Sequence, residues 1–226
     1  MNNTILRYND DFISELLRIA IGDGTSNNIE FEFIYGSNHT TRLKRDEFLD
    51  VLEYIQTNNN HKETSNSLDI SCRINKVYSN VRISINGVDN IKRYCKKDDL
   101  STIPNEHIEY MKKSPYVDKS ITNGRYNIID NEFNYRVNLK TEDILTNKSP
   151  EVSELLTNWK SLNKLFRYKK RYSYITSNSL FRIDLTIVKT NIWNNEFKSY
   201  NLSKSFKDSN VSVSYTHLTL PTILLV

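Results

Sequence analysis

Apolar residues recur at helical spacing in several segments of the chain. Asp10–Ile21 places its apolar residues on one face, after acidic residues that suit the start of a helix. Arg45–Gln56 and Pro150–Trp159 show the same amphipathic pattern, and Val88–Tyr94 and Pro104–Lys113 show it less clearly. We therefore predict five helices, three of them clearly amphipathic.

Alternation of apolar and polar residues covers most of the remaining chain. This period of two is typical of strands with one buried face, and neighbouring strands of this kind form antiparallel hairpins. The polar segment Asn58–Asn66 is predicted as a loop. The pattern predicts an α+β fold with strands at Asn28–Tyr35, Leu68–Lys76, Asn80–Asn86, Arg125–Ile129, Asn134–Lys140 (its polar face running on to Glu142), Leu165–Thr176 and Leu180–Thr190.

Charged side chains share one face of each predicted strand. In Asn28–Tyr35, for example, Glu30 and Glu32 oppose Phe31 and Phe33, because successive side chains point to opposite faces. The same separation recurs along the chain. The candidate functional residues on these polar faces are Glu30, Glu32, Arg82, Arg136, Glu142, Arg167, Lys169, Arg171, Arg182, Asp184 and Thr186.

Two arrangements are compatible with these polar faces. They can be the wet outer side of a sandwich, or they can line the interior of a barrel whose apolar exterior is covered by the helices. Like charges two residues apart repel unless an opposite charge lies between them. A Glu-x-Glu pair suits Mg²⁺ or Mn²⁺, which prefer oxygen ligands, and an Arg-x-Lys-x-Arg ladder suits phosphate. Spacing alone leaves both arrangements open.

Composition excludes several classes of protein. The chain has 226 residues and a net charge of +4, which is too weakly basic to indicate nucleic-acid binding by itself. Cys72 and Cys95 make neither a disulfide framework nor a zinc site, and we expect both to be buried. No signal peptide or transmembrane stretch is evident. We expect a cytoplasmic protein that is not secreted.

Five blocks of sequence, in order, resemble the fungal and DNA-virus type of metal-dependent RNA 5′-triphosphatase, which has the triphosphate tunnel fold. The last two blocks are the most specific, and Arg125 matches a further basic residue of the family loosely. The blocks are Glu30-Phe-Glu32, Arg82, Arg136-Val-Asn-Leu-Lys-Thr-Glu142, Arg167-Tyr-Lys-Lys-Arg-Tyr-Ser-Tyr174 and Arg182-Ile-Asp-Leu-Thr-Ile-Val188.

The resemblance implies an antiparallel β-barrel with a charged lumen and external helices, which removes the γ-phosphate of nascent RNA in the first step of mRNA capping. It implies that Glu30 and Glu32 hold Mg²⁺ or Mn²⁺ and that Glu142 orients the attacking water. Basic residues would bind the phosphates: Arg82, Arg125, Arg136, Arg167, Lys169, Arg171 and Arg182. Asp184 and Thr186 would support them, although a purely structural Arg182–Asp184 ion pair remains open. The expected partners are 5′-triphosphate RNA and a fused or associated guanylyltransferase.

The family closes its barrel with a second Glu-x-Glu strand, and the end of this chain departs from that pattern. Val213–Thr222 resembles a translated sequencing-library adapter; the alternative is a genuine apolar strand. We expect residues 1–212 to be a triphosphatase-like domain that lacks its last strand, and residues 213–226 to be a non-native tail. The 226-residue chain by itself would then be inactive.

Two other functions fit parts of the pattern. A non-catalytic module could bind polyphosphate or RNA ends, and a hydrolase of the same fold could act on free nucleotides or inorganic triphosphate. The Glu30/Glu32 pair favours an enzyme, because a protein that only binds polyanions gains nothing from acids in its lumen.

Overall fold

The computed structural model describes residues 29–35, 45–74, 77–116, 127–130, 135–176, 182–192, 212–214 and 217–218. The helices are α2 (Arg45–Asn58), α3 (Val88–Lys97) and α4 (Pro150–Thr157), with short 3-10 turns η1 (Leu100–Thr102) and η2 (Asn105–His107). The strands are β1 (Ile29–Tyr35), β2 (Asn60–Ile74), β3 (Val77–Asn86), β4 (Ile108–Pro115), β5 (Asn127–Asp130), β6 (Tyr135–Leu145), β7 (Asn163–Ile175), β8 (Arg182–Ile192), β9 (Ser212–Ser214) and β10 (His217–Leu218).

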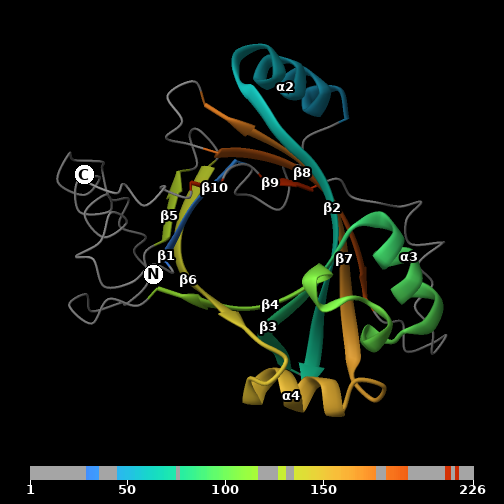
Figure 1. The fold of residues 1–226 in the computed structure, drawn as a ribbon. Coiled ribbons are helices and arrows are strands. Elements are labelled where there is room, and N and C mark those ends of the chain that lie inside the picture. Colours follow the sequence, from blue (N-terminus) through green and yellow to red (C-terminus); the bar gives the residue numbers. More distant parts are fainter. Residues whose placement is uncertain are drawn as a thin grey trace, which may run out of the picture.

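These strands form one antiparallel sheet that curls into a ring (Figure 1). Their order is β10-β1-β6-β4-β3-β2-β7-β8-β9, with β5 paired only to β6. The predicted hairpins β2–β3, β5–β6 and β7–β8 are all confirmed by their pairing. The predicted helices at α2, α3 and α4 are confirmed as well.

The described strands β1 and β8 are not hydrogen-bonded to each other. Between them lie the short strands β9 and β10, which pair with β8 and β1 respectively. β10 also contacts β8, and β1 contacts β9, so the two ends of the sheet meet. Within the described residues, the ring is therefore a barrel whose hydrogen-bonded path is open between β9 and β10. Apart from Ser212, both strands belong to the segment 213–226, whose assignment as a non-native tail stays a prediction.

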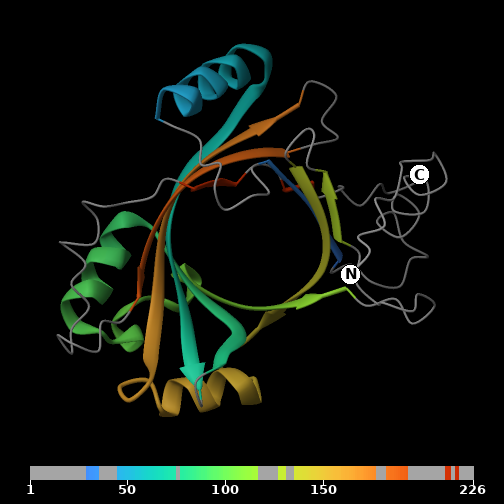
Figure 2. The ribbon, with the colours of Figure 1, turned by 180° about the vertical axis from the view of Figure 1, so that it is seen from behind.

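The outer face of the barrel carries the apolar side chains, and the helices cover them. Figure 2 shows α2, α3 and α4 outside the ring. One core joins the outer side chains of β2, β3 and β7 to α3, η1 and α4. Its most buried members include Leu68, Ile70, Cys72, Val81, Ile83, Ile85, Phe166, Tyr94, Leu100, Val152 and Leu155. A second, smaller core packs Phe48 and Ile55 of α2 against Tyr174 and Leu185 of β7 and β8.

Two of the sequence predictions are wrong. Asn58–Asn66 is not a loop, since from Asn60 onward it is the exposed beginning of β2, held by its pairing with β7. Pro104–Lys113 is not a helix, because it contains the turn η2 and then β4, which pairs with β3 and β6. In both cases backbone pairing with strands remote in sequence overrides the local pattern.

The predicted helix Asp10–Ile21 lies outside the described residues. Of the helices that the structure describes, none has the length and apolar character needed to cross a membrane.

Candidate functional site

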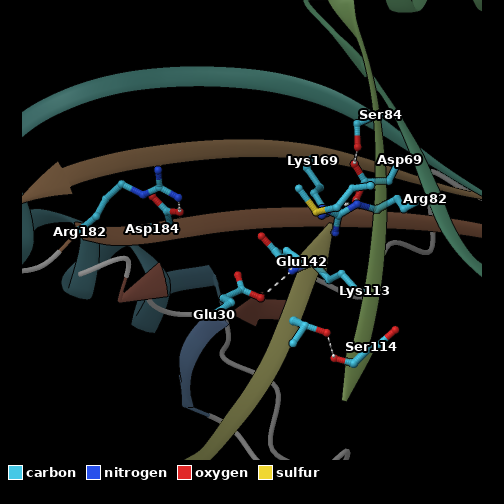
Figure 3. A network of polar contacts seen from close by, with 12 residues as sticks. Glu30, Asp69, Arg82, Ser84, Lys113, Ser114, Glu142, Lys169, Arg182 and Asp184 are labelled. Atoms are coloured by element: carbon cyan, nitrogen blue, oxygen red, sulfur yellow. Dashed lines mark hydrogen bonds and ion pairs between the residues drawn. The ribbon is translucent and has the colours of Figure 1, made fainter. Parts of the chain in front are cut away.

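The polar faces predicted from the sequence point into the barrel. On β2, β3 and β7 the outer face is the core under α3 and α4, so the alternate residues Asp69, Ser84 and Lys169 face the interior. On β8, Leu185 packs under α2, which turns Asp184 inward. Figure 3 shows these residues, from different strands, in the space that the sheet surrounds. The expected charged lumen and apolar exterior are confirmed.

The first inward group, the Asp69 cluster, consists of Asp69, Arg82, Ser84 and Lys169. The hydroxyl of Ser84 donates to Asp69 Oδ1 at 2.9 Å. Lys169 Nζ forms an ion pair with Asp69 Oδ2, and Arg82 Nε lies 3.7 Å from the same oxygen. Asp69 is 2% exposed, so its charge depends on these partners. The cluster holds two cations for one acid.

Burial and charge together set the ionisation of the Asp69–Lys169 pair. Burial works against the charge on Asp69, but Lys169 and Arg82 outweigh it and hold the pKa of Asp69 below its ordinary value. Burial also disfavours the ammonium of Lys169 and lowers its pKa to about 8, although Asp69 opposes that shift. Lys169 is therefore a cation at neutral pH that loses its proton within a working range of pH.

The second inward group, the Asp184 cluster, consists of Arg171, Ser173, Arg182 and Asp184. Ser173 donates its hydroxyl to Asp184 Oδ1 at 2.7 Å, and an Arg182 guanidinium nitrogen donates to Oδ2 at 3.0 Å. Arg171 lies 3.6 Å from the same Oδ2. Asp184 is 1% exposed. This cluster too holds two cations for one acid.

Two buried donors in these clusters have no acceptor among the described residues. They are Arg82 Nε and Arg182 Nε. A buried N–H group without an acceptor is costly, and an anion inside the barrel would satisfy both. The basic side of the interior is therefore suited to phosphate oxygens.

The third inward group, the Glu30 cluster, brings two acids onto Lys113, and Lys140 of β6 lies directly across from Glu30 in the pairing of β1 with β6. Lys113 Nζ of β4 lies 2.8 Å from Glu30 Oε2 of β1 and forms an ion pair with Glu142 Oε1 of β6. Glu30 is 4% exposed. Two carboxylates from different strands thus converge on one cation (Figure 3). Hard divalent cations bind through one or two carboxylates with water and substrate phosphates, so this donor set fits Mg²⁺ or Mn²⁺.

Within the described residues, no group of three or more His, Cys, Asp or Glu side chains is placed to hold a metal ion. The side chain of Glu32 lies outside the described part of the chain, although its backbone belongs to β1, two residues after Glu30. The acids that the structure brings together at this point are therefore Glu30 and Glu142.

The remaining predicted site residues divide into two groups. Thr186 is buried on the inner face opposite Arg171, and Arg167 is half-buried opposite Asp69. Arg136 is placed only by its backbone in β6, and Arg125 lies outside the described residues. The predicted roles of these four residues stay predictions.

The candidate residues chosen from the sequence lack four members of these clusters: Asp69, Ser84, Lys113 and Ser173. Asp69 alternates with Leu68 and Ile70, so the signal that identified the other strands was present there as well. Lys113 was not assigned to a polar strand face because the segment Pro104–Lys113 was predicted as a helix. The cysteine prediction is half right, since Cys72 is buried with its pKa raised to about 11 by that burial, whereas Cys95 is exposed.

The fold matches solved structures of viral capping enzymes. The RNA triphosphatase domain of a trifunctional mimivirus mRNA capping enzyme superposes with a TM-score of 0.62 at 22% identity, over 98% of this chain and 93% of that chain. A triclinic structure of the mimivirus capping enzyme triphosphatase gives a TM-score of 0.57 at 20% identity, over 93% of this chain and 88% of that one. No protein-family model and no curated protein matches the chain.

The class defined by this fold is the α+β triphosphate tunnel, an antiparallel barrel with external helices. More particularly, the chain has the fold of the mimivirus capping-enzyme triphosphatase over almost its whole length.

Proposed function

We propose that this protein is a metal-dependent RNA 5′-triphosphatase, which hydrolyses the γ-phosphate from the 5′ end of RNA as the first step of mRNA capping. The observation that carries the proposal is the grouping of the inward charges: two clusters each hold two cations for one acid, and in a third the carboxylates of Glu30 and Glu142 share Lys113. A triphosphate needs the former and a divalent metal the latter. The fold shared with a viral capping triphosphatase supports the same reaction.

Glu30 and Glu32 are the residues that would hold Mg²⁺ or Mn²⁺. Such an ion supplies Lewis-acid stabilisation of the phosphate oxygens. Glu30 is suited to this because its carboxylate is buried in the interior and already pairs with a cation. Glu142 shares that cation, so its carboxylate lies close to that of Glu30, and from there it would orient the attacking water.

The basic residues would hold the triphosphate in place and balance its charge. Lys169 and Arg82 face the interior (Figure 3), Arg171 lies beside the inward Asp184, and Arg136 lies on the strand between β1 and β4. Arg125, Arg167 and Arg182 would extend this surface. Phosphoryl transfer depends mainly on such positioning and electrostatic stabilisation. Asp184 would then keep Arg171 and Arg182 in place, with Thr186 beside them.

The proposed partners are 5′-triphosphate RNA and a guanylyltransferase, either fused or associated. The similar mimivirus domain belongs to a trifunctional mRNA capping enzyme. Residues 1–212 would be the triphosphatase domain of such a protein.

The substrate is tested by measuring phosphate release with Mn²⁺ from 5′-triphosphate RNA, GTP and inorganic triphosphate. Turnover is measured in the 226-residue chain and in a version that follows the natural reading frame beyond Ser212. We expect the longer version to prefer 5′-triphosphate RNA. Preference for GTP or inorganic triphosphate would make it a hydrolase of small phosphates, and binding without release in both versions would make it a binding module.

The charge of Lys169 should make phosphate binding depend on pH. Because its pKa is about 8 instead of 10.5, the free protein loses this ammonium as the pH rises through 8. Between pH 8 and 9.5 we expect the affinity for metal-free inorganic triphosphate to fall up to about tenfold per pH unit relative to Lys169→Arg, which stays charged. The same shift makes this group's contribution to folding stability rise over that interval, since the unfolded chain binds the extra proton.

The measurement is isothermal titration calorimetry of metal-free inorganic triphosphate into the wild type and Lys169→Arg, from pH 7 to 9.5. The ratio of their affinities removes the titration of the ligand itself. A ratio that stays constant from pH 7 to 9.5 would show that Lys169 does not bind the anion through its charge.

A further inference from the structure

Lys113 occupies the point where the acids of the barrel meet. Its ammonium is 2.8 Å from Glu30 Oε2 and forms an ion pair with Glu142 Oε1, so it bridges β1 and β6 from β4. The side chain of Lys113 is 21% exposed and that of Glu142 is 24% exposed, against 4% for Glu30. Without a cation at this point, two carboxylates would face each other in a partly buried setting, which is unfavourable.

A divalent cation and this ammonium compete for the same oxygens. A metal bound to Glu30 must lie about 2.0 to 2.2 Å from a carboxylate oxygen, on an acid whose Oε2 already accepts a hydrogen bond from Lys113. Two cations so close together would repel each other strongly inside the protein. Metal binding at Glu30 therefore favours departure of the ammonium.

We propose that Lys113 is the internal counter-ion of the metal-free site and that a divalent cation displaces it. This inference rests on the proposed role of Glu30 in metal binding. Lys113 then sets the metal concentration at which the site fills, and it holds β1, β4 and β6 together when the metal is away. In this role Lys113 is a positioning residue that acts through Glu30 and Glu142.

Lys113→Met tests the competition directly. Because it removes the competing charge while keeping the aliphatic stem, we expect Mn²⁺ to bind about tenfold more tightly than in the wild-type chain. Free Mn²⁺ is measured by electron paramagnetic resonance on the full 226-residue chain without RNA. We also expect the metal-free variant to unfold at a lower temperature and saturating Mn²⁺ to raise that temperature more than in the wild type.

The neighbouring Lys112 provides a matched control. It lies on the same strand but points outward, where its ammonium is 3.1 Å from Glu151 of α4. We expect Lys112→Met to leave the Mn²⁺ affinity unchanged. Lys113→Arg keeps the charge and should stay close to the wild type, and Lys113→Gln repeats the charge removal if the methionine variant does not fold.

The outcomes separate this inference from the proposed function. Equal or weaker Mn²⁺ binding in Lys113→Met and Lys113→Gln, while Glu30→Gln still weakens it, overturns the counter-ion role and leaves the metal site in place. Failure of the wild-type chain to bind Mn²⁺, or unchanged binding in Glu30→Gln, overturns both.

Discussion

Replacing Glu30 by glutamine is expected to lower Mn²⁺-dependent release of phosphate from 5′-triphosphate RNA by about 100-fold or more. Glutamine keeps the size of the side chain but loses the negative charge that holds a divalent cation. Glu30 is 4% exposed and lies in the interior, so water cannot readily take its place. The readouts are phosphate release in the version extended along its natural reading frame and Mn²⁺ affinity in the 226-residue chain.

Glu53→Gln is the control for this experiment. Glu53 is exposed on α2, outside the barrel, so its substitution changes the net charge equally without altering the interior. Both activity and Mn²⁺ affinity should then stay at the wild-type level. Retention of both by Glu30→Gln would remove Glu30 from the metal site.

Replacing Asp184 by alanine is expected to have the largest effect on stability. The substitution leaves Arg171 and Arg182 without their shared counter-ion and the buried hydroxyl of Ser173 without its acceptor. Removing one partner of a buried ion pair typically costs 3 to 5 kcal/mol. Because both arginines are partly exposed, we expect about 3 kcal/mol here. Urea unfolding measures the change in the free energy of unfolding.

Asp89→Ala provides the comparison for this stability measurement. The side chain of Asp89 on α3 is 92% exposed and forms an ion pair with the exposed Lys92. Exposed pairs of this kind contribute about 0.5 kcal/mol at most. If Asp184→Ala lowers the free energy of unfolding by less than about 1 kcal/mol, water takes the place of the Asp184 carboxylate. Asp184 would then matter more for its position near the phosphates than for stability.

The alternation of apolar and polar residues was enough to predict most of the strands and many of the inward-facing charged residues. Arg182-Ile-Asp184 and its neighbours alternate strictly, and the structure places Ile183 toward α2 and Asp184 toward the interior, as a period of two requires. The sequence therefore predicts which face of each strand is buried against the helices and which face carries charges. The grouping of these charges into three clusters was not, because it depends on the order of strands in the sheet.

The failures of prediction have a common cause. At Asn60–Asn66 the side chains are polar on both faces, so nothing local indicates a strand, and pairing with β7 alone extends β2. Around Ile108–Lys113 the spacing of Ile108 and Met111 resembles one turn of a helix. There, pairing with β3 and β6 decides the structure. In both segments the structure depends on pairing with strands distant in sequence, and the local sequence carries no periodic pattern that indicates this pairing.

The central claim is that metal and triphosphate bind together inside the barrel, between the Glu30 cluster and the Asp69 cluster. A crystal structure of the chain soaked with Mn²⁺ and inorganic triphosphate, with the metal located by its anomalous scattering, tests it most directly. We expect the Mn²⁺ peak within coordination distance of a Glu30 carboxylate oxygen and a phosphate within hydrogen-bonding distance of Lys169. Metal and triphosphate found only on the outer surface, with the Glu30–Lys113–Glu142 contacts unchanged, would contradict the account.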